Sequence, residues 1–367
     1  MRAVLNRIGL WPVWAKILAV LLAAAVLVGG VSVSLALRSG LGRTAKPKAA
    51  QTAARGATEP SPAATPAASS IPLASTLSCR LPISSGQPGS GGFVTFPSAA
   101  FAADPASSVK PEEGYGYALS YDRAAGKWLP VPRSNVSPDG ARYTYWDWPT
   151  KSIRVVSVSG GSETSIGPRA NGAASAARLN AQGWQVIEAL DEGVYASPVG
   201  ETAAGLWLFP WSGSGERQIT STGFWHAVGG GAAWGTVSQS VPEGAANTIL
   251  RMDRSGGAHV DWFSRPGLQS RVMGFDSSGH AVVQATSKDV TEVWLVIGQG
   301  NGTRLLTIPP PAPQQQGPGG PIRPFLQSVV GDDKGVWLAT SDGLYISTAA
   351  RTEKVSTVTG QLGGGCA

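Results

Sequence analysis

The side chains that most often carry out chemistry are few and scattered in this sequence. The three histidines, His226, His259 and His280, lie far apart, and none has a neighbour at the spacing of a His-Glu-x-x-His zinc site. The chain has no Cys-x-x-Cys pair and no Gly-x-Ser-x-Gly nucleophile elbow. The sequence therefore indicates no catalytic residue, no metal site and no cofactor.

Two short acidic segments, residues 276–279 and 332–335, are the remaining candidates for ion binding. They read Asp-Ser-Ser-Gly and Asp-Asp-Lys-Gly, and either could be part of a calcium loop. A complete calcium loop needs more oxygen ligands in succession. Turns are the commoner role of such Asp/Ser/Gly segments, and we interpret both as turns.

The thirteen tryptophans are the most prominent residue signal. Exposed indole rings, for example at Trp146 and Trp148, could stack on sugars or anchor a protein partner. The alternative is that they fill the gaps between packed sheets. Aromatic residues carried on strands alternate with other side chains as core residues do, which favours the second interpretation.

The elements that must position these side chains are short strands in a repeated order. Residues 325–358 contain four β-rich runs separated by Gly/Asp turns. The glycine of the first turn recurs at intervals of 38 to 56 residues, at Gly140, Gly193, Gly231, Gly279 and Gly335. Repeats of about this size must stack on neighbours to bury their apolar faces, and four strands per repeat are typical of a propeller blade.

We therefore predict an all-β fold, a six-bladed β-propeller spanning residues 79–367, with seven blades as the alternative. High Gly and Pro content, with only 14% charged residues, fits a turn-rich β domain. The first blade is predicted to contain strands at residues 93–96, 115–121 and 128–131. Later blades begin near Ser134, Gln185, Gly223, Ser270 and Phe325, and residues 309–321 form an inserted loop.

Two of these repeats resemble known propeller families. Ser137-Pro138-Asp139-Gly140 and the five residues after it resemble the repeat of TolB-type, WD40-like propellers. Residues 335–345, Gly-Val-Trp-Leu-Ala-Thr-Ser-Asp-Gly-Leu-Tyr, are similar to the repeat of two-component-regulator sensor propellers. The resemblance implies a role in protein binding or sensing, although a fold alone does not define function.

The loops give the candidate binding residues. Turns between the first and second strands of each repeat are short, whereas loops between the second and third strands are longer and more varied. In a propeller the longer loops share one face with the connections between blades, and variable loops on a rigid scaffold commonly carry binding residues. The predicted ligand-binding residues on this face are Trp148, Lys151, Glu201, Gln239, Glu243, Lys288 and Asp342.

The N-terminal region has the features of a membrane anchor. Residues 1–16 form a basic leader, and residues 17–37 are 21 uncharged residues, enough to cross a bilayer as a helix. Trp11 and Trp14 precede this run, where the membrane interface favours Trp. The alternative is a signal peptide cleaved after Ser34-Leu35-Ala36, but its apolar region would be unusually long.

Residues 38–78 are rich in Ala, Pro, Thr and Ser, so we predict a disordered linker. Residues 1–60 hold eight basic residues and one acidic residue, and the rest of the chain therefore has a net charge of −1. The basic character belongs to the N-terminal tail, which argues against nucleic-acid binding by the folded domain.

The only two cysteines, Cys79 and Cys366, flank the predicted propeller. A disulfide between them would close the ring and would require an oxidising compartment; two unrelated free thiols are the alternative. Five basic residues follow the apolar run and three precede it, which by charge alone favours a cytoplasmic C-terminal part. We expect the opposite orientation, because long domains translocate largely regardless of charge.

These features together predict a single-pass protein of the cell membrane with an extracytoplasmic propeller. Residues 17–37 would contact the lipid bilayer, and the propeller would bind or sense a protein or carbohydrate ligand. The alternative is a propeller hydrolase or lyase that acts in the central channel, which should gather His and carboxylate side chains at the channel mouth.

Overall fold

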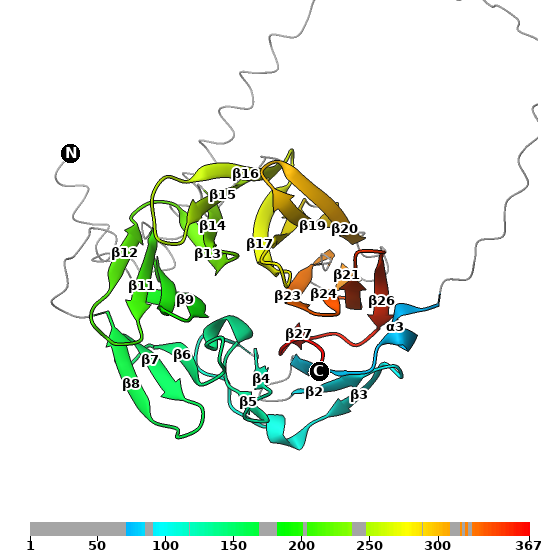
Figure 1. The fold of residues 1–367 in the computed structure, drawn as a ribbon, viewed down its shortest axis with the longest axis horizontal. Helices are drawn as coiled ribbons and strands as arrows, with labels where there is room; N and C mark the ends of the chain where they lie inside the picture. Colours follow the sequence, from blue (N-terminus) through cyan, green and yellow to red (C-terminus); the bar gives the residue numbers. More distant parts are fainter. Residues whose placement is uncertain are drawn as a thin grey trace, which may run out of the picture. The chain divides into compact units, whose positions relative to one another are not determined.

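The computed structural model describes residues 71–84, 91–116, 118–168, 182–200, 204–236, 247–287, 289–308, 316–317, 320–321 and 325–367. This part of the chain is built mainly of short antiparallel strands. Its helical segments are α3 (Leu73–Thr76) and two 3-10 turns, η1 (Pro105–Ser107) and η2 (Arg133–Asn135). The strands form sheets arranged as blades around a central axis (Figure 1).

Five blades are complete four-stranded antiparallel sheets, named here from their inner to their outer strand. The first blade contains β27 (Gln361–Leu362), β1 (Arg80–Ser84), β2 (Gly91–Thr95) and β3 (Ala100–Ala103). The third contains β9 (Gly183–Leu190), β10 (Gly193–Val199), β11 (Leu206–Pro210) and β12 (Arg217–Thr220). The fourth contains β13 (Phe224–Gly229), β14 (Ala232–Thr236), β15 (Asn247–Asp253) and β16 (Val260–Arg265).

The last two complete blades follow in the same order. The fifth contains β17 (Gln269–Phe275), β18 (Ala281–Thr286), β19 (Thr291–Gly298) and β20 (Asn301–Ile308). The sixth contains β23 (Leu326–Asp332), β24 (Gly335–Thr340), β25 (Gly343–Ser347) and β26 (Thr352–Ser356). A short ladder, β21 (Gln316–Gly317) with β22 (Gly320–Pro321), lies in the inserted segment between them.

The second blade is the least regular. Its sheet contains β6 (Arg142–Asp147), β7 (Ser152–Ser157) and β8 (Glu163–Gly167), and a single bridge from Val136 to Tyr143 marks its inner edge. The fold is therefore the predicted six-bladed propeller. The repeats begin within about two residues of the predicted positions, at η2, β9, β13, β17 and β23.

The predicted composition of the first blade is wrong. Strands β4 (Ser120–Asp122) and β5 (Lys127–Leu129) pair only with each other and lie between the first blade and the β6–β8 sheet (Figure 1). The predicted strand at residues 115–121 is shortened because Gly114 and Gly116 both adopt positive φ angles, which place a turn there. The C-terminal strand β27 instead supplies the inner edge of the first blade.

The recurring glycine has a steric cause. Gly193 and Gly335 each open the second strand of a blade, with φ angles of 153° and 146°. A Cβ atom at Gly193 would lie 2.3 Å from the carbonyl oxygen of Phe209, and one at Gly335 would lie 2.4 Å from that of Ser347. Only glycine lets the second strand approach the third so closely at this point.

Large aromatic side chains fill the spaces between neighbouring blades. Trp337 is fully buried, and Trp184, Trp207, Trp225 and Trp234 are each at most 4% exposed. Trp184 on β9 packs edge-on against Trp207, with ring centroids 5.1 Å apart. The interpretation of most strand-borne tryptophans as core residues is confirmed.

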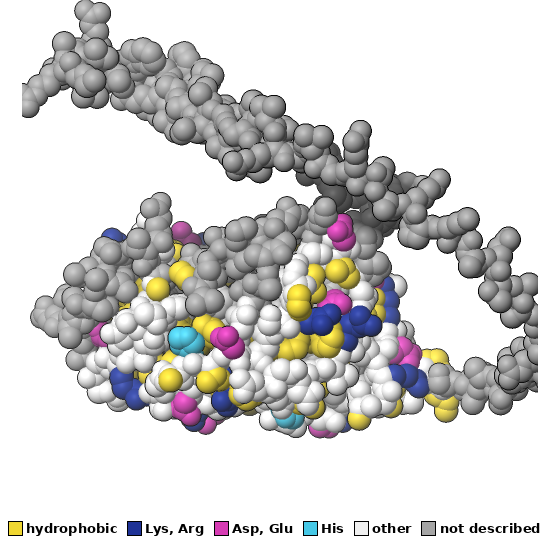
Figure 2. Space-filling view, turned by 90° about the horizontal axis from the view of Figure 1, so that it is seen from above, with side chains coloured by type: hydrophobic (Ala, Val, Ile, Leu, Met, Phe, Trp, Pro, Cys, Tyr) yellow, Lys and Arg dark blue, Asp and Glu magenta, His cyan; other side chains and the backbone are white. Residues whose placement is uncertain are grey.

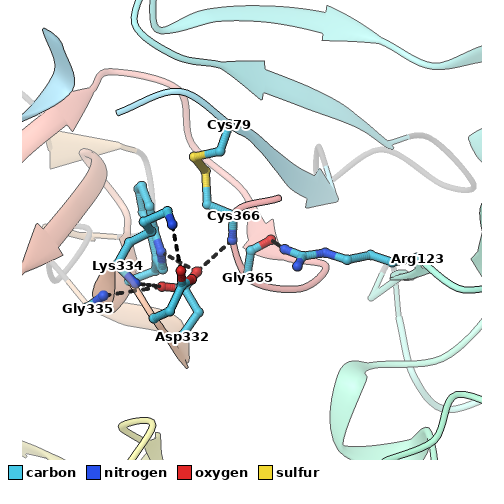
Figure 3. Close-up of a disulfide and its surroundings, with 9 residues drawn as sticks. Cys79, Arg123, Asp332, Lys334, Gly335, Gly365 and Cys366 are labelled. Carbon is cyan, nitrogen blue, oxygen red and sulfur yellow. Dashed lines mark hydrogen bonds and ion pairs between the residues drawn. A yellow bond between two sulfur atoms is a disulfide. The ribbon is translucent and has the colours of Figure 1, made fainter. Parts of the chain in front are cut away.

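The ring is closed by the two ends of the domain. Gln361 and Leu362 pair with Ser84 and Ile83, and the predicted disulfide joins Cys79 to Cys366 with a Cα–Cα separation of 5.5 Å (Figure 3). Residues 361–365, with their run of glycines, are predicted from the sequence to be flexible and so to let Cys366 reach Cys79. They are instead fixed, because the Gly363 amide donates to Pro82 at 2.8 Å and its carbonyl accepts from the Tyr121 amide at 2.8 Å.

The described part of the chain begins eight residues before the predicted domain start at Cys79. The Leu73 amide of α3 donates to Glu353 Oε1 at 3.1 Å, and Leu77 is buried in the core shared by the first and last blades. No helix within the described part is long and apolar enough to cross a membrane. The predicted leader, membrane span and most of the linker lie outside the described residues.

Candidate functional site

One end of the propeller carries the three predicted site residues that the structure describes. We call it the loop face: the end where the second strand of each blade connects to the third, and where the fourth connects to the next blade. Trp148 and Lys151 lie there in the β6–β7 turn, and Asp342 lies there in the β24–β25 turn. Glu201, Gln239, Glu243 and Lys288 lie outside the described residues.

Asp342 organises its own turn. Its carboxylate accepts hydrogen bonds from Thr340 Oγ1, Tyr345 Oη at 2.9 Å and Lys354 Nζ at 3.0 Å. Although partial burial acts in the opposite direction, these hydrogen bonds lower the pKa of the Asp342 carboxyl. The side chain is thus already committed to local contacts. Lys151 is exposed and has a positive φ of 50°, which places it at the tip of its turn.

Trp148 forms one wall of an aromatic pocket, which we call the Trp148 pocket. Its lining includes Tyr115, Trp146, Trp148 and Trp184, and its volume is about 300 Å³. Trp148 is 40% exposed, whereas Trp146 and Trp184 are each 4% exposed. Trp146 and Trp148 meet edge to face, with centroids 6.1 Å apart. The pocket therefore has a firmly packed floor and one exposed indole at its entrance.

Neighbouring glycines fix the position of the exposed ring. A Cβ at Gly183 would lie 2.7 Å from the Trp148 ring, so the indole packs directly on the backbone of β9. Gly114 leaves space on the Nε1 side of the same ring. Trp148 is consequently held by backbone on two sides while part of its surface remains accessible. A fixed aromatic surface of this kind binds at low entropic cost.

Polar groups surround the aromatic surface. Glu113, Ser134 and Gln185 contribute to the lining. Burial, together with the charges of Glu163 and Asp147, raises the pKa of the Glu112 carboxyl next to the pocket. Among the described residues Trp146 Nε1 is buried and has no hydrogen-bond partner. The pocket thus offers stacking surface together with donors and acceptors.

The central channel holds a second group of polar and charged side chains, which the sequence analysis did not single out. A cavity of about 650 Å³ is lined by the inner strands and by Arg133, Glu188, His226 and Arg271. It adjoins a pocket of about 510 Å³ that opens at the loop face and shares Gln185, His226 and Arg271 with it. Glu188, His226 and Arg271 each lie in an inner strand, whereas Arg133 lies in η2.

His226 braces two blades. Its Nε2 accepts a hydrogen bond from the Val272 amide at 3.1 Å, and the ring also bonds to the Phe224 backbone. Burial, followed by the positive charge of Arg271, lowers the pKa of His226 to about 3. The ring is therefore neutral at physiological pH and links β13 to β17.

Glu188 behaves differently from a surface carboxylate. Burial in the channel wall raises its pKa to about 8, although the positive charge of Arg133 acts in the opposite direction. Arg133 itself donates from Nη1 to the Val136 carbonyl at 2.8 Å. At neutral pH the channel wall thus carries two guanidinium groups and a mostly protonated carboxyl.

Arginines on the outer rim have a different environment. Arg265 stacks on Trp294, 4.4 Å from the ring centroid, and its Nε donates to Glu292 at 3.1 Å. Arg304 also lies within 3.5 Å of Glu292. The edge-on view shows Lys and Arg side chains beside acidic and hydrophobic ones on the rim (Figure 2). Both of these arginines therefore have a carboxylate partner, Glu292.

The two acidic segments at residues 276–279 and 332–335 form turns, as predicted. Asp276 Oδ1 accepts from the Ser278 and His280 amides at 2.9 and 2.7 Å. Asp332 Oδ1 accepts from the Lys334 and Gly335 amides at 2.9 and 3.2 Å. The described residues contain no group of three or more His, Cys, Asp or Glu side chains placed to hold a metal ion.

Comparison with known proteins identifies no family. The chain matches no protein-family model and no curated protein sequence. Its structure is similar to a chain of a nidogen/laminin complex, with 13% identity, a TM-score of 0.39 and coverage of 77% of this chain and 98% of that one.

Two further structures show similarity at the same low level. A protein from Lactobacillus plantarum has 10% identity and a TM-score of 0.45, with 78% of this chain and 97% of that one covered. The Cps50 (Swd1) β-propeller domain of Myceliophteria thermophila has 11% identity and a TM-score of 0.33, with 74% and 81% covered. The resemblance to TolB-type and sensor propellers remains a prediction from the repeats, and what is established is the six-bladed fold.

Proposed function

We propose that this protein is a membrane-anchored, extracytoplasmic binding or sensing module that engages a protein or carbohydrate ligand at the loop face. The Trp148 pocket is the observation that carries the proposal. It combines a fixed, partly exposed indole with a packed aromatic floor and surrounding polar groups. Its volume of about 300 Å³ is at the lower end of the range for sites that accept one ring or side chain.

The disulfide supports the proposed compartment. Cys79 and Cys366 are joined across the ends of the domain, and such bonds form and persist in oxidising compartments. Together with the apolar run at residues 17–37, this supports an anchor in the cell membrane with the propeller outside the cytoplasm. The linker at residues 38–78 would separate the propeller from the bilayer.

Binding can be tested with two variants of the full-length chain. Trp148→Ala removes the exposed wall of the pocket, and Ile297→Ala removes a side chain that is 48% exposed on β19, outside the pocket. A carbohydrate ligand is sought on a glycan array, and a protein ligand by a photo-crosslinker introduced at Lys151 beside the pocket. We expect Trp148→Ala to weaken binding at least about tenfold, as truncation of a central aromatic anchor does.

The control variant should bind like the wild type. If Trp148→Ala and Ile297→Ala retain equal binding while the ligand still binds the propeller, the pocket is not the site. A crosslink that persists unchanged in Trp148→Ala would exclude the pocket for the protein ligand as well.

A channel hydrolase or lyase is the second candidate, and one observation favours it. Glu188 faces the channel and its pKa of about 8 is typical of a carboxyl that serves as a general acid. The neighbouring His226 is held by two backbone contacts as a brace between blades. Loss of a measured hydrolase or lyase activity in Glu188→Gln, with normal folding, would support this alternative over the binding module.

A further inference from the structure

The inner strands of the propeller are sheet edges that line the central channel. β9, β13, β17 and β23 each form one edge of their sheet and surround the axis in Figure 1. An edge strand has backbone N–H and C=O groups that its own sheet does not use. On β17 the outward Val272 amide already has a channel-side partner, the ring of His226. The channel wall therefore supplies hydrogen-bond donors in addition to its side chains.

Two guanidinium groups line the same cavity. Arg133 comes from η2 in the second blade, and Arg271 comes from β17 in the fifth. Both side chains are accessible from the channel. The surrounding protein lowers the pKa of each by restricting its hydration. Arginine nevertheless stays charged at neutral pH.

Arg271 has no acidic partner within the described part of the chain. No described carboxylate oxygen lies within 4.0 Å of its guanidinium, in contrast to Arg265 and Arg304 on the rim, which both contact Glu292. The titratable group that faces Arg271 is His226, which is neutral. Glu188 and Asp122 both act electrostatically on Arg133. The cavity lining also includes the Asp276 carboxylate, which accepts hydrogen bonds from the Ser278 and His280 amides. Two guanidinium groups therefore face this one carboxylate and the mostly protonated Glu188 carboxyl.

We propose that the channel binds an oxyanion, the carboxylate or phosphate group of a small acidic ligand, between Arg271 and Arg133. The ligand enters from the loop face, where the adjoining pocket shares Arg271 with the channel cavity. Guanidinium groups bind carboxylate and phosphate through paired N–H donors, and edge amides of the inner strands add neutral donors. The cavity volume of about 650 Å³ accommodates a ligand of metabolite size.

The proposal is tested on the full-length chain by calorimetric titration at constant ionic strength. The probes are citrate, inorganic phosphate and, as a neutral control, glucose. We expect saturable binding of citrate or phosphate and none of glucose. Arg271→Gln should weaken anion binding at least about tenfold, because a charge-assisted contact is lost. Arg304→Gln on the rim is the matched control and should change affinity less than about twofold.

Two further variants show whether the guanidinium itself holds the anion and whether the two pockets are independent. Arg271→Lys keeps the charge without the planar fork, so its affinity should fall between those of the wild type and Arg271→Gln. Trp148→Ala, in the other pocket, should leave anion binding unchanged, so the two sites can fail independently. No saturable binding of either anion, or equal affinity in Arg271→Gln and Arg304→Gln with both proteins folded, would overturn the proposal.

Discussion

The carboxylate of Asp332, in the last blade, accepts a hydrogen bond from the backbone amide of Cys366 at 2.7 Å (Figure 3). The same oxygen accepts from Trp337 Nε1 at 2.8 Å, and the other oxygen caps the turn that begins β24. Arg123, next to β4, donates to the neighbouring Gly365 carbonyl. One side chain thus connects the core of the last blade to the segment that closes the ring.

Asp332→Ala should therefore destabilise the whole propeller. It leaves the indole N–H of Trp337, a ring that is fully buried, and the Cys366 amide without their acceptor. Each unsatisfied buried donor costs about 1–3 kcal/mol, so the loss should be on the order of 3 kcal/mol. Urea unfolding measures it. Asp333→Ala changes the next residue, which is 73% exposed, and should alter stability by less than about 0.5 kcal/mol. Equal effects of both variants would contradict this role.

Cys79→Ser should lower the melting temperature without opening the blade. The disulfide spans 287 residues, and the chain-entropy account gives an upper value of about 6 kcal/mol for such a loop. Pairing of β27 with β1 and the Asp332 contact remain, so the variant should still fold. Non-reducing mass spectrometry should find the Cys79–Cys366 crosslink in the wild type. A melting temperature unchanged in both Cys79→Ser and the reduced wild type would show that the bond adds no stability.

These closing contacts show where sequence reasoning succeeds and where it stops. The turn glycines, such as Gly335, report a local steric need, so they revealed the repeat and most blade boundaries. The disulfide between Cys79 and Cys366 could be predicted because the sequence contains only these two cysteines. β27 was missed because its two residues gain their strand conformation only from pairing with β1, at the other end of the domain.

The residues of the candidate sites likewise include some that local sequence predicts and others that it does not. Trp148 was predicted because the β6–β7 loop is recognisable from the repeat, but Tyr115 and Trp184, which complete its pocket, come from distant segments. Arg133 and Arg271 come from different blades, and only the ring geometry brings them to one cavity. A local pattern cannot indicate such a pair, because nothing in the sequence near Arg133 specifies what lies across the axis.

His226 should make the fold sensitive to acid. Its pKa is about 3 in the folded protein and near 6.5 when unfolded, so between these values only the unfolded state takes up the proton. The contribution of His226 to the free energy of unfolding is constant above pH 6.5. It becomes increasingly unfavourable as the pH falls from 6.5 toward 3. The loss of unfolding free energy caused by His226 should be on the order of 1–2 kcal/mol at pH 5 relative to pH 7. Comparing urea unfolding of His226→Gln and wild type at pH 7 and 5 should show a weaker pH dependence in the variant.

The exposed His259 provides the control for this experiment. His259→Gln should keep the pH dependence of the wild type, since it leaves the His226 contacts intact. If His226→Gln and His259→Gln have the same pH profile, the His226 brace does not contribute to acid sensitivity.

Glu188 should lower the stability of the fold as the pH rises, whereas His226 lowers it as the pH falls. Its folded pKa of about 8 lies above the ordinary value of 4.5, so stability from this group is fully present below pH 4.5 and is lost as the pH rises through 8. Glu188→Gln, which cannot ionise, should therefore gain stability relative to the wild type between pH 5 and 9, by at most about 4 kcal/mol. Unfolding at these two pH values measures the gain, and Glu113→Gln, at an exposed site, should show none. A constant difference at both pH values would contradict the assigned titration.

The orientation of the chain in the membrane is the last prediction. Three basic residues precede residues 17–37 and five follow within the next 18 residues, so a charge count alone places the propeller in the cytoplasm. The Cys79–Cys366 disulfide supports the opposite side, because cytoplasmic thiols are kept reduced. A phosphatase reporter fused after Ala367, which is active only outside the cytoplasm, should therefore be active, and a fluorescent reporter that folds only in the cytoplasm should be dark.

Replacing Arg38 and Arg43 with Gln lowers the charge after the span and should not reduce phosphatase activity. An inactive phosphatase fusion together with a fluorescent cytoplasmic reporter would place the propeller in the cytoplasm. That result would remove the basis for an extracytoplasmic ligand.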